Sequence, residues 1–290
     1  MRPRELRTRI FLDGGDPEET RSIMKLLGFL DGQTTNPTLI SKNPEAKKRL
    51  DRGGAFSSGE VLDFYRNVVR EISELLPRGS VSVEVYADAA TRSEAMLAQG
   101  REMFQWIPNG HVKFPASQNG LRAAQAAVQE GMRVNMTLVF SQEQAAAVHA
   151  ATRGAKRGDV FLSPFIGRLD DRGENGMDLI ANIIGMYQKG DGHVEVLTAS
   201  VRKLDHLKRA LQLGSDIITA PFSVLREWGE MGMPLPDRKF RYDAKGLAPM
   251  PAEDLQLDRD WTSYDIRHEL TDKGMAKFSD DWNALISKAA

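Results

Sequence analysis

Short apolar runs alternate along this chain with longer segments of a different periodicity. Eight apolar runs stand out, several of them rich in Val and Ile: Ile10–Leu12, Gly28–Asp31, Val81–Tyr86, His111–Phe114, Val134–Val139, Val160–Ser163, Val194–Thr198 and Asp216–Thr219. Between most of these runs, apolar residues recur every three or four positions, as they do on one face of a helix. The pattern predicts β-strands that alternate with α-helices.

Capping signals support this alternation. Asp16 precedes Pro17 and two acidic residues, and Ser117 and Ser141 follow apolar runs in the same way. Such residues favour a helix start directly after a strand. Eight strand–helix units predict an α/β fold of one closed (β/α)8 barrel, and an open doubly wound sheet is the alternative. No Gly-x-Gly-x-x-Gly motif follows the first strand, which disfavours a dinucleotide-binding sheet.

The composition changes after Trp228. Residues 229–265 contain four prolines and alternating charges with little periodicity, which predicts an irregular excursion. Asp272–Ile286 regains a helical stripe, for which Thr271 or Asp272 is the expected cap. We therefore expect a catalytic barrel over residues 1–228 and a C-terminal extension over 229–290. This extension would pack on the barrel or on a neighbouring subunit.

The overall composition excludes several classes of protein. The 290 residues carry 39 Lys and Arg against 40 Asp and Glu, with no Cys and a mean hydropathy of −0.40. The balanced charge argues against a nucleic-acid partner, and the absence of Cys excludes disulfides and thiolate metal sites. No apolar run is long enough to cross a membrane, and no leader follows the basic first residues. We expect a cytoplasmic protein.

Polar residues gather where the predicted strands end. They include Asp13, Thr34, Asn36, Glu84, Lys113, Asn135, Thr137, Ser163, Arg168, Ser200 and Arg202. In a (β/α)8 barrel these positions meet at one mouth, where active sites lie. The set predicts a functional site.

Lys113 is the most informative of these residues because apolar neighbours flank it within a strand. Burial disfavours the charged ammonium, and a neutral amine can attack a carbonyl to form a Schiff base. Asp13 and Glu84 would supply the proton-transfer groups that this reaction needs. A lysine at a strand end that extends to water is the alternative.

Two arginines follow the sixth and seventh strands. Arg168 and Arg202 predict a clamp for a phosphate group, and surface ion pairs with Asp170 or Asp171 are the alternative. The five histidines show no metal-ligand spacing, so the sequence predicts no metal site.

Several motifs resemble the transaldolase family. They are Phe11-Leu12-Asp13, Thr34-Thr35-Asn36-Pro37-Thr38, Ser82-Val83-Glu84-Val85, His111-Val112-Lys113-Phe114-Pro115, Asn135-Met136-Thr137, Ser163-Pro164-Phe165-Ile166-Gly167-Arg168 and Thr198-Ala199-Ser200-Val201-Arg202. They run from residue 10 to about residue 228. Residues 268–282 resemble the C-terminal helix of short microbial members.

The resemblance implies a role for each matched residue. Lys113 would form the Schiff base, Asp13 would move the proton for carbon–carbon cleavage, and Glu84 with Thr137 would hold a water molecule. Substrate contacts would come from Thr34, Asn36, Asn135, Ser163, Phe165, Arg168, Ser200 and Arg202. The expected partners are sugar phosphates, with no cofactor, and the expected assembly is a homo-oligomer.

Three functions remain open at this stage. The first is transfer of a dihydroxyacetone unit from sedoheptulose 7-phosphate or fructose 6-phosphate to an aldose phosphate, a pentose phosphate pathway reaction. The second is a fructose-6-phosphate aldolase, which releases free dihydroxyacetone. Those aldolases resemble the pattern with Tyr in place of Phe165 and Gln in place of Glu84, so both residues favour the transferase. The third is a non-catalytic barrel that binds sugar phosphates, which retention of Lys113, Asp13 and Glu84 disfavours.

Overall fold

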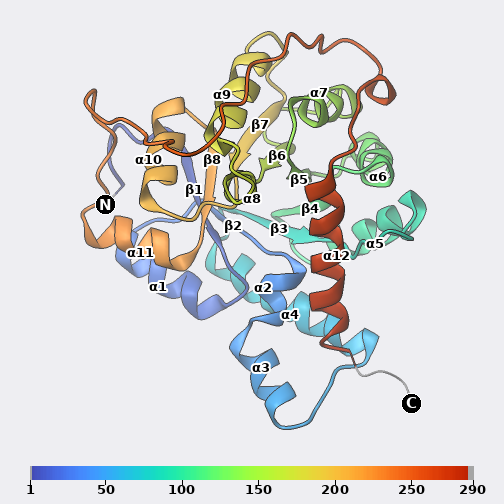
Figure 1. Ribbon diagram of the computed structural model, residues 1–290. Coiled ribbons are helices and arrows are strands. Elements are labelled where there is room, and N and C mark those ends of the chain that lie inside the picture. The colour runs from blue at the N-terminus through green and yellow to red at the C-terminus, as the bar shows by residue number, and fades with distance from the viewer. Residues whose placement is uncertain (1, 287–290) are drawn as a thin grey trace.

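Eight parallel strands close into a barrel in the order of the sequence, and helices surround it (Figure 1). This computed structural model describes residues 2–286. Residue 1 of the predicted barrel and residues 287–290 of the predicted extension lie outside the described residues. The strands are β1 Arg9–Asp13, β2 Gly32–Thr34, β3 Ser80–Glu84, β4 Gly110–Pro115, β5 Val134–Val139, β6 Val160–Pro164, β7 Val194–Thr198 and β8 Ile217–Ala220. The predicted single (β/α)8 barrel is confirmed.

Twelve α-helices lie among the described residues, and most of them cover the outside of the barrel. They are α1 Pro17–Leu27, α2 Pro37–Ser41, α3 Pro44–Asp51, α4 Ser58–Leu75, α5 Ser93–Phe104, α6 Gln118–Gln129, α7 Gln142–Ala151, α8 Ile166–Asp170, α9 Gly176–Tyr187, α10 Leu204–Leu213, α11 Phe222–Glu230 and α12 Glu269–Asn283. The predicted caps Asp16, Ser117 and Ser141 each accept a hydrogen bond from the first turn of α1, α6 and α7.

Two predicted elements are displaced in the structure. The second strand begins at Gly32, after the predicted Gly28–Asp31 run. Gly28 ends α1 in a left-handed conformation with φ 74°, so this apolar run is the turn between helix and strand. Helix α12 begins three residues before the predicted start, because the side chain of His268, rather than Thr271 or Asp272, accepts the capping bond from the Leu270 amide.

The segment between α11 and α12 runs along the ends of α9, α7 and α6 (Figure 1). Asn182 of α9 donates to the carbonyl of Met250 at 2.9 Å, and Gln142 of α7 donates to that of Pro251 at 2.9 Å. Trp261, in a short 3-10 turn (Trp261–Ser263), donates from its indole to Gln125 of α6 at 3.1 Å. These bonds hold the irregular segment on the barrel and lead the chain to α12.

Helix α12 lies across the carboxyl ends of the strands rather than in the outer ring. Thr271 donates from its hydroxyl to the carbonyl of Leu138 in β5 at 2.9 Å, and the Trp282 ring meets Tyr65 of α4 edge-on at 5.8 Å. Along its length α12 packs on α2 and β5. One side of the barrel mouth is therefore closed by this helix.

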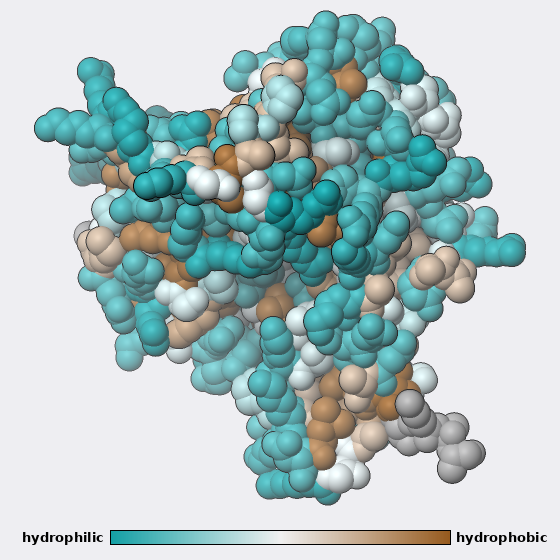
Figure 2. Space-filling view, viewed as in Figure 1, coloured by the Kyte–Doolittle hydropathy of each residue, from teal (hydrophilic) through white to brown (hydrophobic). Residues whose placement is uncertain are grey.

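Hydrophilic residues cover most of the face seen in Figure 2, and hydrophobic residues come together near its lower end, close to the end of α12. The apolar core lies between the barrel and its helices. Within residues 2–286, no helix is both long and apolar enough to span a membrane.

The connection from β4 to α6 leaves no room for a side chain at Gly120. A Cβ built there would lie 1.9 Å from the carbonyl oxygen of Pro115, whereas one at Gly185, exposed within α9, would meet nothing within 4 Å. We expect Gly120→Ala to lower the free energy of unfolding by about 1–3 kcal/mol through overpacking. Gly185→Ala should raise it by about 0.5–1 kcal/mol through helix propensity. Urea unfolding of both variants measures the effects, and equal changes would contradict the close approach at Gly120.

Candidate active site

Strand register brings three polar residues into one row of the barrel. Glu84 of β3 lies opposite Lys113 of β4, and Lys113 lies opposite Asn135 of β5. All three side chains are buried. Because the strands are parallel and adjacent, their polar side chains meet inside the barrel mouth, as the sequence predicts.

Lys113 is held by two acceptors. Its Nζ lies 2.8 Å from Oε2 of Glu84 and donates to the carbonyl oxygen of Thr35 at 3.0 Å. The exposed fractions of the Lys113 and Glu84 side chains are 3% and 4%. Burial raises the pKa of Glu84, although the charge of Lys113 opposes that effect. Nζ of Lys113 and the carboxyl group of Glu84 are therefore close enough for direct proton transfer.

Asp13 ends β1 and lies near Lys113. Thr34, its register partner in β2, donates to Oδ1 of Asp13 at 2.7 Å and contacts the hydroxyl of Thr219 at 2.6 Å. Desolvation raises the pKa of Asp13, and the positive charge of Lys113 lowers it in part. A carboxyl group with a raised pKa can take up and return a proton nearer to neutral pH.

A chain of hydrogen bonds crosses the barrel from β3 to β6. Asn135 donates from its amide to the Ser82 hydroxyl at 3.0 Å and accepts from the Ser163 hydroxyl at 2.7 Å. The buried hydroxyl oxygen of Thr137 has no hydrogen-bond partner among the described residues. Thr137 is therefore the group of this set with free capacity for a water molecule or a ligand.

Asn36 has a structural role as well as a place at the mouth. Its side-chain oxygen caps α2 by accepting from the Leu39 amide at 2.9 Å. Because the cap uses the oxygen, the NH2 end of the same amide remains as the donor for a bound molecule.

The two predicted phosphate ligands differ in their surroundings. The guanidinium of Arg168 lies 5.4 Å from the ring centres of Phe165 and Phe278, and burial lowers the pKa of Arg168. Arg202 instead forms a bidentate ion pair with Asp171 at 2.6 and 2.7 Å. The nearby positive charge of Arg202 also lowers the pKa of Arg168, so two like charges lie close together. Such a pair favours an anion between them.

The carboxyl ends of β6 and β7 approach closely beside these arginines. Ser200 has a left-handed backbone with φ 58°, and its carbonyl accepts from the Gly167 amide at 3.1 Å. A Cβ at Gly167 would lie 2.5 Å from that carbonyl oxygen. The absence of a side chain at Gly167 therefore lets Arg168 and Ser200 lie at one edge of the mouth.

Phe165 lies between β6 and α8 and is buried. Its ring meets Phe140 edge-on at 5.9 Å, and the guanidinium of Arg168 lies over its face. The segment after the sixth strand thus places an apolar ring, with no hydroxyl, beside Arg168.

Several residues that contribute to the candidate site were not predicted from the sequence. Tyr65 accepts a hydrogen bond from the Glu84 amide at 2.9 Å and contacts the Thr35 hydroxyl at 2.6 Å, although its helical position marks it as a core residue. Ser82 could have been found, because it lies two positions before Glu84 and so faces the same side of the strand. The contribution of α12 had no local signal: a Cβ at Gly274 would lie 2.7 Å from Nη1 of Arg168.

Comparison with known proteins shows the family of this chain. The profile of the family described as Transaldolase/Fructose-6-phosphate aldolase matches residues 10–289. A probable transaldolase of Dehalococcoides mccartyi is 35% identical over 277 residues, which is 96% of this chain and 99% of that protein. A probable transaldolase of Brucella ovis is 35% identical over 282 residues, covering 97% and 100% of the two chains.

Among solved structures, 3-hexulose-6-phosphate synthase from Salmonella typhimurium is similar with a TM-score of 0.47 and 13% identity, over 79% of this chain and 100% of that chain. This match is too distant to bear on the activity. The family profile and the relatives, by contrast, span nearly the whole sequence. The chain therefore belongs to the transaldolase/fructose-6-phosphate aldolase family.

Proposed function

We propose that this protein is a transaldolase that acts through a Schiff base on Lys113. It would transfer a dihydroxyacetone unit from sedoheptulose 7-phosphate or fructose 6-phosphate to an aldose phosphate. The observation that carries the proposal is the buried contact of Lys113 with Glu84, close to the raised-pKa carboxyl group of Asp13. A lysine buried beside carboxyl groups with shifted pKa values is typical of a functional site.

The first half of the reaction needs a neutral amine and a controlled water molecule. Glu84 takes the proton of Lys113, and the amine then attacks carbon 2 of the ketose to form a carbinolamine. Loss of the hydroxyl group as water gives the iminium ion. Thr137, whose hydroxyl has free capacity, would hold this water with Glu84. The same water later hydrolyses the imine.

Carbon–carbon cleavage then needs a base at carbon 4. Asp13 removes the proton of the carbon 4 hydroxyl, and the bond between carbons 3 and 4 breaks. The electron pair moves into the iminium, which becomes an enamine on Lys113, and the shortened aldose phosphate leaves. With the acceptor aldehyde the steps reverse, and Asp13 returns its proton to the new hydroxyl group. Thr34 orients Asp13 through its hydrogen bond of 2.7 Å.

The remaining polar residues suit the two ends of the substrate. Asn36 and Asn135 would bind hydroxyl groups of the dihydroxyacetone unit. Ser163 would orient Asn135 through its bond of 2.7 Å and contribute to the phosphate end. At that end Arg168, Ser200 and Arg202 would receive the phosphate, which would compete with Asp171 for Arg202.

A fructose-6-phosphate aldolase is the second candidate, because the family includes both activities. It would use the same lysine and release dihydroxyacetone in place of transferring it. Phe165 and Glu84 favour the transferase, since the aldolases resembled have Tyr and Gln at these positions. A non-catalytic barrel is disfavoured by the contact of Lys113 with Glu84.

The broader setting is proposed on the same basis. We place the reaction in the pentose phosphate pathway and the enzyme in the cytoplasm, as a homo-oligomer. Residues 1–228 would form the catalytic barrel, and residues 229–290 an extension that completes the mouth through α12.

Replacing Lys113 should abolish covalent trapping. Wild-type protein treated with fructose 6-phosphate and borohydride should gain the mass of one reduced dihydroxyacetone adduct, whereas Lys113→Arg and Lys113→Ala should gain none, because neither offers an amine. Lys113→Arg keeps a cation beside Glu84 and so limits misfolding. Lys42→Arg, at an exposed lysine whose charge acts on Asp13, is the control and should label normally. Labelling of the Lys113 variants at the wild-type level would contradict the assignment.

Replacing either arginine should selectively lower kcat/KM for phosphorylated substrates. We expect Arg168→Gln and Arg202→Gln each to cost about 1.5–3 kcal/mol in kcat/KM for fructose 6-phosphate, roughly 10- to 150-fold, with little change for unphosphorylated fructose. Asp171→Asn removes the competing ion-pair partner of Arg202 and should not lower kcat/KM for the phosphorylated substrate. Steady-state kinetics on both sugars measure the difference. Equal losses on the two sugars would indicate that the arginines are structural.

A hydroxyl group on Phe165 should increase leakage of the intermediate. Release of free dihydroxyacetone requires a proton on the enamine carbon and then attack of water on the imine. The Phe165 ring cannot position either, whereas Phe165→Tyr supplies a phenol that can. We expect this variant to release more dihydroxyacetone from fructose 6-phosphate and to transfer less. A coupled assay without acceptor aldehyde measures the release. If the wild type already releases dihydroxyacetone as fast as it transfers it, the protein is an aldolase.

A further inference from the structure

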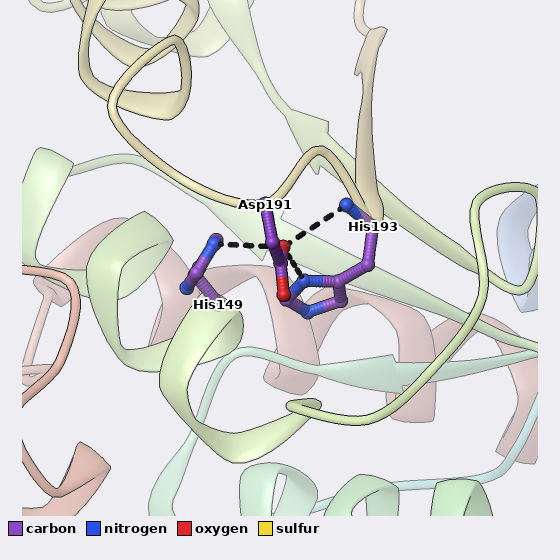
Figure 3. Close-up of side chains that lie close together, drawn as sticks. All are labelled: His149, Asp191 and His193. Atoms are coloured by element: carbon purple, nitrogen blue, oxygen red, sulfur yellow. Dashed lines mark hydrogen bonds and ion pairs between the residues drawn. The ribbon is translucent and has the colours of Figure 1, made fainter.

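Two histidines and an aspartate converge around one carboxylate oxygen (Figure 3). They lie at the amino end of β7, whereas Lys113 lies toward the carboxyl end of β4. His149 lies in the last turn of α7, Asp191 in the loop after α9, and His193 directly before β7. The amino end of β7 and the carboxyl end of α7 belong to the amino-terminal face of the barrel, so the cluster is separate from the proposed active site. His149 lies about 40 residues before Asp191 and His193 in the chain, so the spacing of the histidines does not indicate a metal site.

One carboxylate oxygen faces both imidazoles. Oδ1 of Asp191 lies 3.4 Å from Nε2 of His149 and contacts Nδ1 of His193. His149 and His193 are 5% and 3% exposed, whereas the Asp191 side chain is 59% exposed. The cluster therefore has a buried nitrogen side and a carboxylate that opens to solvent.

The hydrogen bonds around His193 determine which ring nitrogen carries the proton. Thr152 donates its hydroxyl hydrogen to the carbonyl of Val148 at 2.8 Å, so its oxygen is an acceptor toward Nε2 of His193 at 3.0 Å. Nε2 of His193 therefore donates to Thr152, and Nδ1 is the ring nitrogen that faces Asp191. Oδ1 of Asp191 and Nδ1 of His193 are in direct contact, so one metal ion can bind both only after the carboxylate turns away from the ring.

His149 favours the metal ion. Both of its ring nitrogens are buried, and neither has a hydrogen-bond partner among the described residues. The buried ring of His149 therefore has a nitrogen available to bind a metal ion. Within residues 2–286, the contact between Asp191 and His193 leaves both ring nitrogens of His149 without a hydrogen bond. A metal ion would serve all three side chains.

We propose that His149, Asp191 and His193 bind a divalent transition-metal ion, with zinc as the best match. Zinc binds imidazole and carboxylate ligands at about 2.0–2.2 Å, which places tetrahedral ligands roughly 3.3 Å apart. The separation of 3.4 Å between His149 and Asp191 agrees with that value. Asp191 needs to move away from His193 by a small rotation, which its exposure permits, and water completes the coordination.

The surroundings support this assignment. A Cβ at Gly190 would lie 2.6 Å from Nε2 of His149, so the glycine lets the loop approach the ring. The bond from His193 to Thr152 is of the kind that orients metal-binding histidines. Arg153 is the unfavourable charge nearby, but its guanidinium donates to the carbonyls of Leu257 and Arg259 at 2.8 Å. A bound ion would tie α7 to the loop that leads into β7.

Metal titration of the tag-free full-length protein, first stripped with a chelator, tests the proposal. We expect one equivalent of zinc by calorimetry, a cobalt-substituted form with the strong visible absorption of a tetrahedral site, and a zinc-dependent rise in Tm. Asp191→Asn should weaken zinc binding at least tenfold and abolish the rise in Tm. This variant should fold, because the Asn oxygen can still accept the His193 amide bond at 3.2 Å.

Two further variants complete the test. Asp254→Asn, at an exposed acid paired with Lys189 near the same loop, is the matched control and should bind zinc like the wild type. Thr152→Val removes the partner of His193 and should weaken binding about 10- to 100-fold. Absence of stoichiometric binding, or equal binding by wild type and Asp191→Asn, would overturn the proposal. In that case the pair of Asp191 and His193 is a proton-shared contact.

Discussion

An ammonium group inside a closed barrel costs free energy unless acceptors surround it, and the contact of Lys113 with Glu84 meets that requirement. The carbonyl of Thr35 provides the second acceptor, at 3.0 Å. Both acceptors depend on strand register: β3 must lie beside β4 with Glu84 opposite Lys113, and β2 must end at the same level. Because removal of one partner would leave the other buried and unpaired, this contact constrains the whole mouth of the barrel.

The mouth is asymmetric around this pair. On one side Asp13 and Thr34 provide a carboxyl group with a raised pKa. On the other, Arg168 lies between Phe165 and Phe278, so α12 contributes to the surroundings of a residue from the sixth strand. In the proposed reaction, Asp13 would serve as the proton-transfer group near Lys113, and Arg168 would supply positive charge. The proposed ketose phosphate, which carries a carbonyl group and a phosphate group, would use both kinds of residue.

The sequence predicts the barrel and its polar mouth because both depend on local periodicity and on one topological rule. It places the second strand too early, since the apolar run at Gly28–Asp31 is a turn that ends α1. It detects neither the approach of Gly274 to Arg168 nor the meeting of His149 with Asp191, because both contacts join segments far apart in the chain. The sequence leaves two roles open for Arg202, phosphate binding and a surface ion pair. The structure contains the ion pair, with Asp171.

The central claim is that the reacting carbon bonds to Nζ of Lys113 while the phosphate lies beside Arg168. A crystal structure of the protein soaked with fructose 6-phosphate and frozen before turnover tests both parts at once. The account predicts continuous electron density from Nζ of Lys113 to carbon 2 of the sugar, Asp13 within hydrogen-bond distance of the carbon 4 hydroxyl, and the phosphate between Arg168 and Arg202. Sugar bound without a covalent link, or with its phosphate away from these arginines, would contradict it.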